Sequence, residues 1–124
     1  MFIDSHCHLD RLDLSEFDNN LDNVINAASE VNVTEMLCVS VTLKDFPLMA
    51  EQTKHYNNVF LTCGAHPLNQ EDKISHDELL NMAQHKRVIA IGETGLDYHY
   101  APETKYRQQD SFRKHIQGAK KLAK

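Results

Sequence analysis

Residues 88–98 read Val-Ile-Ala-Ile-Gly-Glu-Thr-Gly-Leu-Asp-Tyr. The apolar, β-branched start of this stretch predicts a buried strand over 88–93, and the glycines and polar residues that follow predict a loop. Glu93 therefore stands at the end of a buried strand, where an unpaired charge would cost free energy. The stretch predicts a strand of a parallel sheet and a partner for the carboxylate of Glu93.

The same order of apolar strand, polar loop and helical periodicity occurs four times in the 124 residues. Strands are predicted over residues 1–4, 35–41, 59–63 and 88–93. Helical periodicity follows over residues 21–28 and 45–55, from residue 75 onward, and over residues 103–124. Strands that alternate with helices predict an α/β fold with a parallel sheet covered by helices.

Local signals support these helices. Ser75-His76-Asp77-Glu78 has the pattern of a capping box, and Pro47 is tolerated in a helix only within the first turn. The last helix is predicted to bury one apolar side, made of Tyr106, Phe112, Ile116, Ala119 and Ala123. The histidines in helical stretches are predicted to be exposed polar positions; they are His55, His76, His85 and His115.

A His-x-His pair, His6 and His8, follows the first predicted strand. Residues i and i+2 of an extended chain project to the same side, so one backbone can aim both imidazoles at one point. Cys7 alternates with them and is expected to point away. Because the chain contains eight histidines, such a pair also arises by chance, and it needs support from elsewhere in the chain.

That support comes from the ends of other strands. Gly64-Ala65-His66-Pro67 follows the third predicted strand and Glu93 ends the fourth, so the chemistry-bearing residues gather where a βα-barrel keeps its active site. A complete barrel needs eight units and about 250 residues. The sequence therefore predicts a TIM-barrel type fold of which the chain supplies the first four βα units, a half-barrel.

Two histidines and one carboxylate suit a divalent ion, because imidazole favours Zn or Mn and carboxylate accepts Mg or Mn. His6, His8 and Glu93 are therefore the predicted metal ligands. A carboxylate that bridges two ions would also help to place a nucleophile between them. The alternative for Glu93 is an ion pair with a lysine or arginine at the barrel mouth.

Composition excludes several other classes of protein. The chain is 41% hydrophobic and has no apolar run near the roughly 20 residues of a membrane span. Met1-Phe2-Ile3 lacks a secretory pattern, and the three widely spaced cysteines form neither a disulfide framework nor a zinc ribbon. We expect a cytoplasmic protein without a membrane partner, in which Cys38 and Cys63 are buried as small apolar residues.

The net charge of −5 is unevenly distributed. Residues 1–35 contain eight acidic residues and one basic residue, whereas residues 105–124 contain seven basic residues and one acidic residue. The basic segment would help to attract a polyanion, or it forms the solvated face of an amphipathic helix. No glycine-rich phosphate loop follows any strand, which argues against nucleotide binding of the P-loop or dinucleotide type.

Three segments together resemble one known family. Asp4-Ser5-His6-Cys7-His8-Leu9-Asp10, Gly64-Ala65-His66-Pro67 and Gly92-Glu93-Thr94-Gly95-Leu96-Asp97-Tyr98 are similar to the first half of the TatD metal-dependent deoxyribonucleases, which belong to the amidohydrolase-like barrels. The segment that begins at Gly92 is the most specific part. The resemblance covers the whole chain and identifies residues 1–124 as the N-terminal half of a single TatD-like barrel domain.

The resemblance implies exonucleolytic hydrolysis of phosphodiester bonds in DNA at one or two Mg, Mn or Zn ions. His6 and His8 would bind one ion, and Glu93, the catalytic carboxylate, would bridge two. His66 would bind substrate near its phosphate, and Tyr98 would contact substrate. The alternatives are that His66 is a hydrogen-bonded histidine held by a proline turn and that Tyr98 packs locally, while Asp97 is expected to brace its loop.

The family has further metal ligands on its fifth, sixth and eighth strands, which have no positions in this chain. The 124 residues alone are therefore expected to be inactive or nearly so. Two other functions remain open: a related barrel hydrolase with another substrate, and an inactive half-barrel that binds metal or assembles with a partner. Because a half-barrel leaves two strand edges unpaired, we expect a C-terminal half or self-association.

Overall fold

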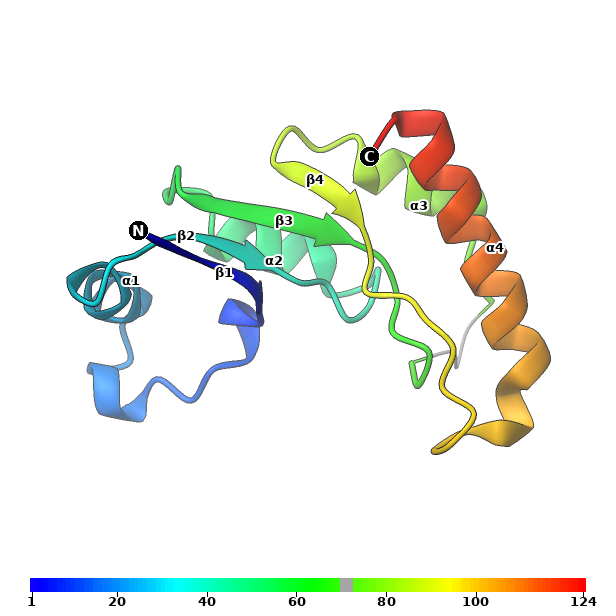
Figure 1. Ribbon diagram of the computed structural model, residues 1–124, viewed down its shortest axis with the longest axis horizontal. Helices are drawn as coiled ribbons and strands as arrows, with labels where there is room; N and C mark the ends of the chain where they lie inside the picture. The colour runs from blue at the N-terminus through cyan, green and yellow to red at the C-terminus, as the bar shows by residue number, and fades with distance from the viewer. Residues whose placement is uncertain (70–72) are drawn as a thin grey trace.

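The computed structural model describes residues 1–69 and 73–124. Its strands form one parallel sheet in the order β1-β2-β3-β4, so strands that are consecutive in the chain are neighbours in the sheet (Figure 1). The predicted α/β class with a parallel sheet is confirmed. The strands are β1 Phe2–Cys7, β2 Val33–Cys38, β3 Val59–Cys63 and β4 Val88–Ile91.

Helices connect these strands. They are η1 Leu9–Arg11, η2 Ser15–Phe17, α1 Leu21–Glu30, α2 Phe46–Gln52, α3 His76–Ala83, η3 Pro102–Thr104 and α4 Lys105–Leu122, where η marks a 3-10 helix. α1 contacts β2, α3 contacts β3, and α4 contacts both β4 and α3. Figure 1 shows α2 behind the sheet, whereas none of the helices of residues 1–69 and 73–124 lies over the near face of the strands.

The helix starts follow local chemistry. The hydroxyl of Ser75 accepts a hydrogen bond from the Glu78 N–H at 3.3 Å, which confirms the predicted start of α3. Asn20 caps α1 by accepting from the Asp22 N–H at 2.9 Å. Pro47 lies in the first turn of α2, as predicted, where its missing N–H leaves no helical hydrogen bond unmade.

The core lies between the sheet and its helices. Alternate strand residues are buried there, as the period of two in a strand requires. Leu79 of α3 and Met49 of α2 pack against this side of the sheet and are fully buried. Cys38 and Cys63 belong to the same cluster, which confirms that they are buried small residues. The strand residues of the core are Met36, Cys38, Val59, Leu61, Cys63 and Val88.

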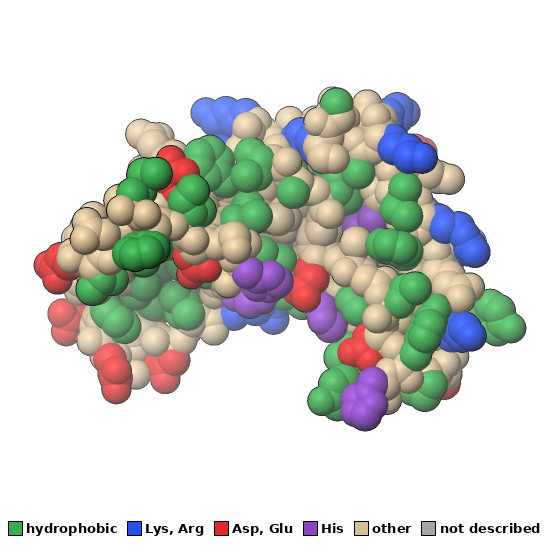
Figure 2. Space-filling view, in the orientation of Figure 1, with side chains coloured by type: hydrophobic (Ala, Val, Ile, Leu, Met, Phe, Trp, Pro, Cys, Tyr) green, Lys and Arg blue, Asp and Glu red, His purple; other side chains and the backbone are tan. Residues whose placement is uncertain are grey.

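The opposite face of the sheet is apolar but poorly covered. Leu37 and Phe60 pair across β2 and β3 and are half-buried, and Ile3 of β1 is exposed. Hydrophobic side chains are visible over much of this face in Figure 2. None of the helices in the described part of the chain is both long and apolar enough to cross a membrane.

Several predicted boundaries are wrong by a few residues. β1 extends to Cys7 rather than ending at Asp4, so His6 lies inside the strand. β2 begins and ends earlier than the predicted 35–41, and β4 ends before Gly92. α2 is shorter than 45–55, and a 3-10 turn precedes α4. The residue at which a strand ends depends on where its neighbour in the sheet ends, and the local sequence of one strand does not contain that information.

The buried side of α4 also differs from the prediction. Tyr106 is 83% exposed, Ile116 is 39% exposed and Ala123 is exposed, whereas Phe112 and Ala119 are half-buried. The buried residues of α4 are Gln108, Ser111, His115 and Gly118. Gly118 lies against Leu79, because a Cβ there would be 3.6 Å from that side chain. His115 was predicted to be exposed and is buried, His76 and His85 are half-buried, and His55 is exposed as predicted.

The core predicts a clear difference between two identical substitutions. Leu79→Ala should lower the free energy of unfolding by about 2–5 kcal/mol, because it empties space in a fully buried cluster. Leu48→Ala, on the exposed side of α2, should change it by less than about 0.5 kcal/mol. Urea unfolding followed by circular dichroism measures both. Equal losses would show that α3 does not pack on the sheet as described.

Candidate metal centre

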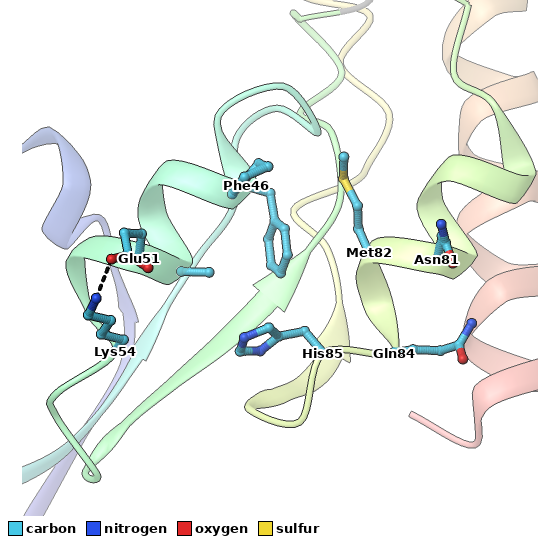
Figure 3. Close-up of a pocket in the computed structure, with 9 residues that line it drawn as sticks. Phe46, Glu51, Lys54, Asn81, Met82, Gln84 and His85 are labelled. Atoms are coloured by element: carbon cyan, nitrogen blue, oxygen red, sulfur yellow. Dashed lines mark hydrogen bonds and ion pairs between the residues drawn. The ribbon is translucent and has the colours of Figure 1, made fainter.

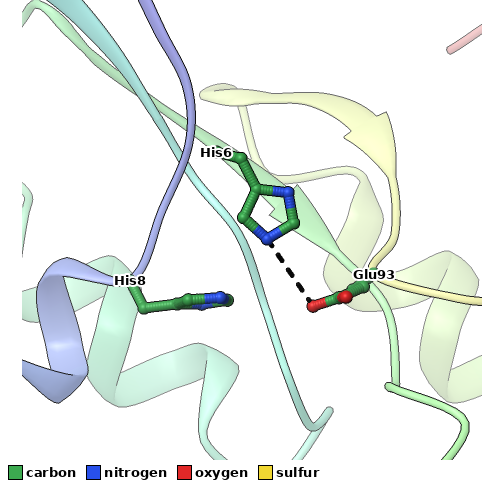
Figure 4. A group of neighbouring side chains, drawn as sticks. All are labelled: His6, His8 and Glu93. Atoms are coloured by element: carbon green, nitrogen blue, oxygen red, sulfur yellow. Dashed lines mark ion pairs between the residues drawn. The ribbon is translucent and has the colours of Figure 1, made fainter.

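His6, His8 and Glu93 come together at the carboxyl ends of the edge strands (Figure 4). His6 is the last residue but one of β1, His8 follows that strand, and Glu93 follows β4. One ligand atom from each of the three lies within 4.8 Å of the others. The structure therefore places the three predicted ligands in one cluster, although the chain separates Glu93 from the histidines by more than 80 residues.

The two histidines converge as their i, i+2 spacing predicts. Their rings are perpendicular, with centroids 5.1 Å apart. His6 Nε2 is 3.8 Å from Glu93 Oε2. Opposite ligands of one ion stand no more than about 4.4 Å apart, twice a typical bond length of about 2.2 Å. Small side-chain rotations would therefore bring all three donor atoms onto one divalent ion.

A backbone carbonyl orients His8. Its Nδ1 lies 2.9 Å from the carbonyl oxygen of Val39, so Nδ1 carries the proton and donates it there. Nε2 is then left with its lone pair available. An outer hydrogen bond that fixes the tautomer and the ring direction is the usual companion of a metal-ligating histidine.

Glu93 lies between two histidines. Its second oxygen, Oε1, is 3.6 Å from His66 Nε2, and the side chains of Glu93 and His66 are about three-quarters buried. The Glu93 N–H donates to Ser40 O at 2.9 Å, and the His66 N–H donates to Val41 O at 2.8 Å. Ser40 and Val41, which follow β2, thus bind the backbone N–H groups of both Glu93 and His66. The carboxylate of Glu93 was expected to have a partner, and its neighbours are the histidines His6 and His66. The alternative of an ion pair with a lysine or arginine is not what the structure shows for Glu93.

Two buried hydroxyls that sequence reasoning missed connect the strand ends. Thr62 Oγ1 accepts from the Ser40 N–H at 3.0 Å and donates to the carbonyl oxygen of Gly92. The Ser40 hydroxyl lies 3.0 Å from Gly64 O and 3.1 Å from Thr42 O. This network ties β2, β3 and β4 together next to Glu93. Hydroxyls inside apolar strands were the available signal, since buried hydroxyls need partners.

Gly64 is required by a close approach of two backbones. A Cβ at this position would lie 2.5 Å from the carbonyl carbon of Gly92 and 2.8 Å from Glu93 O. Only a residue without a side chain fits there. The backbone of Glu93 therefore rests directly on the end of β3.

Cys7 faces away from the cluster, as predicted. Its thiol donates to Leu37 O at 3.4 Å, between β1 and β2. A hydrogen bond with Cys38, together with burial, raises the pKa of Cys7 and keeps it a neutral thiol. It is therefore not available as a thiolate ligand.

Tyr98 lies against α4 rather than in the cluster of His6, His8 and Glu93. Its hydroxyl accepts from Gln109 Nε2 at 2.9 Å, and Lys105 Nζ lies 5.1 Å from the centre of its ring. Asp97 Oδ1 accepts from the His99 N–H and the Tyr100 N–H, at 3.0 and 2.9 Å. These contacts confirm that Asp97 braces its loop.

Two of the pockets formed by the described residues lie away from the cluster. One, between α2 and α3, has a volume of about 500 Å³ and includes Phe46 and His85, whose rings meet edge to face (Figure 3). The only charged residues on its wall, Glu51 and Lys54, are paired with each other. The other, of about 310 Å³, lies beside Ala65 and includes Lys44, Lys73, Asp45 and Glu78. Neither brings together three metal-ligating side chains from the described residues.

Comparison with known proteins places the chain in context. The profile of the family described as TatD related DNase matches residues 3–124. The chain is 44% identical over 122 residues to the uncharacterized metal-dependent hydrolase YcfH of Escherichia coli K12, covering 98% of this chain and 46% of that protein. It is 34% identical over 135 residues to human deoxyribonuclease TATDN3, covering 97% and 48% of the two.

The fold has a match among solved structures. The crystal structure of YJJV, a TatD homolog from Escherichia coli K12, superposes with a TM-score of 0.82 and 24% identity, covering 97% of this chain and 47% of that one. The match confirms the predicted half of a TIM barrel. The chain spans about half the length of the curated relatives it matches.

The close approach at Gly64 predicts a specific defect. Gly64→Ala should lower the free energy of unfolding by about 1–3 kcal/mol, since the new methyl group overlaps backbone atoms that side-chain rotation cannot move. It should also shift the amide resonance of Glu93 in ¹H–¹⁵N NMR spectra. Gly95→Ala is the control, because its Cβ would meet only ring carbons of Pro67, at 3.5 Å or more. An undisturbed Glu93 in Gly64→Ala would contradict this account.

Proposed function

Because the chain belongs to the TatD related DNase family, a family of metal-dependent hydrolases, we propose that it is the metal-binding N-terminal half of a single barrel domain that cleaves phosphodiester bonds of DNA, exonucleolytically. The observation that carries the proposal is the cluster of His6, His8 and Glu93 at the carboxyl ends of parallel strands. That end of the strands is where barrel enzymes place their catalytic groups.

The donor set fits a divalent ion, and we propose Mg, Mn or Zn, one or two per complete site. His6 and His8 would bind through imidazole nitrogens, and the tautomer of His8 already leaves Nε2 available. Glu93, with one oxygen toward His6 and the other toward His66, would bridge two ions. A bound ion would polarise a phosphoryl oxygen and make water a stronger nucleophile at neutral pH.

The protein groups around this centre have distinct roles in the proposal. Glu93 is the catalytic carboxylate, since it would hold the ions in the spacing that the reaction needs. His66 would donate a hydrogen bond to a phosphate oxygen from the side of Glu93 that faces away from His6. Tyr98 would contact a part of the substrate farther from the cleaved bond. The deoxyribonuclease name of TATDN3 supports DNA as the substrate.

The free edges of the sheet lead to a proposal about partners. β1 and β4 each pair on one side among the described residues, and Phe2, Ile3 and Ile89 are more than half exposed. We propose that a C-terminal half of the barrel, or a second copy of this chain, covers these edges. The free thiols of all three cysteines fit the reducing conditions of the cytoplasm, where we propose the protein acts.

Metal binding should depend on the cluster. The 124-residue chain should bind Mn²⁺ weakly, because it supplies only three protein ligands, and His6→Ala/His8→Ala should abolish this binding. The matched control is His55→Ala/His99→Ala, which removes two exposed histidines from other segments. Isothermal titration calorimetry and elemental analysis measure the outcome. Equal binding by the two double variants would rule out the cluster as the site.

Glu93→Gln should lower the rate of DNA hydrolysis by the complete barrel roughly 100-fold or more, since it removes a charge and keeps the shape. Glu103→Gln, an identical change at an exposed position, should leave the rate unchanged. Release of nucleotides from end-labelled DNA measures the rate. The 124-residue chain alone should have little activity. Full activity of Glu93→Gln would exclude the bridging role.

The exposed edges predict association. Burying apolar surface contributes about 25 cal/mol per Å², so the uncovered strands should drive the 124-residue chain into a dimer or larger assembly. Sedimentation velocity at micromolar concentration should give a mass above the 14.2 kDa of one chain. A monodisperse monomer that unfolds cooperatively would show that the half-barrel keeps its edges unpaired.

A further inference from the structure

The buried face of α4 is polar, which is unusual for a helix that packs on a sheet. Gln108, Ser111 and His115 are each no more than 3% exposed. Burying such groups costs free energy unless they are hydrogen-bonded. All three have hydrogen-bond partners, and the partners of Gln108 and His115 include backbone groups in the two loops beside the cluster.

His115 holds the loop that carries His66. Its Nε2 accepts from the Ala65 N–H at 3.0 Å, and its Nδ1 lies 2.7 Å from Ser111 O. Only the neutral ring, with its proton on Nδ1, satisfies both contacts. Burial keeps the pKa of His115 below its ordinary value and outweighs the opposite effect of the Ser111 carbonyl. His115 is therefore a neutral acceptor at neutral pH.

This contact acts on the cluster through one peptide unit. Ala65 precedes His66, whose N–H is bound to Val41 O and whose ring is 3.6 Å from Glu93. With Val41 fixing His66 from one side and His115 fixing Ala65 from the other, the backbone of His66 has little freedom to rotate. The ring is held by the Leu68 N–H, which donates to His66 Nδ1 at 3.1 Å, and its place beside Glu93 also depends on where this backbone lies.

Gln108 holds the loop that follows Glu93. Its Oε1 accepts from the Asp97 N–H at 2.7 Å, and its Nε2 donates to Asp97 O at 2.8 Å. The same Nε2 lies 3.0 Å from Ala101 O and 2.9 Å from Thr104 Oγ1. One side chain therefore binds both backbone groups of Asp97 and connects the loop to the start of α4.

We propose that α4 is a positioning helix: His115 sets the place of His66 through Ala65, and Gln108 sets the loop after Glu93 through Asp97. The proposal rests on the function proposed above, because it assigns these two residues to the same site. Both are positioning residues, since neither touches the His6, His8 and Glu93 cluster. The polar face of α4 thus serves the site as well as the core.

Two substitutions at residue 115 separate positioning from packing. Glutamine places an acceptor oxygen at about the reach of His115 Nε2, whereas asparagine reaches only as far as Nδ1. His115→Gln should therefore keep the bond from Ala65, and His115→Asn should lose it. Gln108→Met is the second arm, because it keeps the length of the side chain and removes all its hydrogen bonds.

Amide hydrogen exchange of the 124-residue chain is the first measurement. His115→Asn should speed exchange at Ala65 roughly two- to tenfold and leave Asp97 unchanged, whereas Gln108→Met should do the reverse. His115→Gln should match the wild type. Faster exchange at both amides in every variant would show a general loss of packing and would overturn the proposal, as would an unchanged Ala65 in His115→Asn.

Paramagnetic broadening by Mn²⁺ is the second measurement, and it requires no nuclease activity. Mn²⁺ bound to the cluster should broaden the ring resonances of His66 equally in the wild type and in His115→Gln. In His115→Asn the extent of this broadening should differ from that in the wild type, because the ring of His66 would lie at another distance from the ion. Absence of broadening in the wild type would count against the proposed metal site, while the exchange measurement would still test α4. Identical broadening in all three proteins would show that His115 does not position His66.

Discussion

The hydrogen-bonded hydroxyls of Ser40 and Thr62 join the ends of three strands at the edge where the histidines and Glu93 meet. A parallel sheet offers regular pairing only up to the last residue of each strand, and the segments beyond it need other partners. Here Thr62 accepts from Ser40, just after β2, and donates to Gly92, just after β4, so the two loops cannot shift independently. The absence of a side chain at Gly64 lets the Gly92 and Glu93 backbone lie against β3. The place of the Glu93 carboxylate follows from these contacts.

The helix side of the molecule completes this arrangement. Most of the core is ordinary apolar packing, in which Leu79 and the strand residues exclude water. The buried side of α4 is different, because besides α3 and β4 it meets two loops whose N–H and C=O groups have no strand partner. Gln108 supplies both a donor and an acceptor to Asp97, and neutral His115 supplies an acceptor to Ala65. An apolar helix face there would leave these backbone groups buried and unsatisfied, which costs about 1–3 kcal/mol each.

The sequence was informative where structure depends on nearby residues. The β3 boundaries, the Ser75 cap and the convergence of His6 with His8 follow from periodicity and spacing, and the structure confirms them. The partners of α4 were not predictable in this way, since Ala65 and His115 are 50 residues apart. Tyr106 and Ile116 suggested an apolar side, but burial depends on what a helix meets, and part of what α4 meets is the polar backbone of Ala65 and Asp97. The end of β1 was missed because its last residues are held by β2, through the pairing of Cys7 with Cys38.

The cluster also links the two edges of the sheet. β1 and β4 are separated by three strand spacings, which in a flat sheet is roughly 14 Å at about 4.8 Å each. Yet His6 and Glu93 lie 3.8 Å apart, so the strand ends curve toward one another and long side chains cover the remaining gap. An ion held by both residues would bind this curved form and not a flattened one, and would stabilise it in proportion to the binding free energy. The chemistry proposed for the site and the curvature needed for a barrel would then depend on the same three side chains.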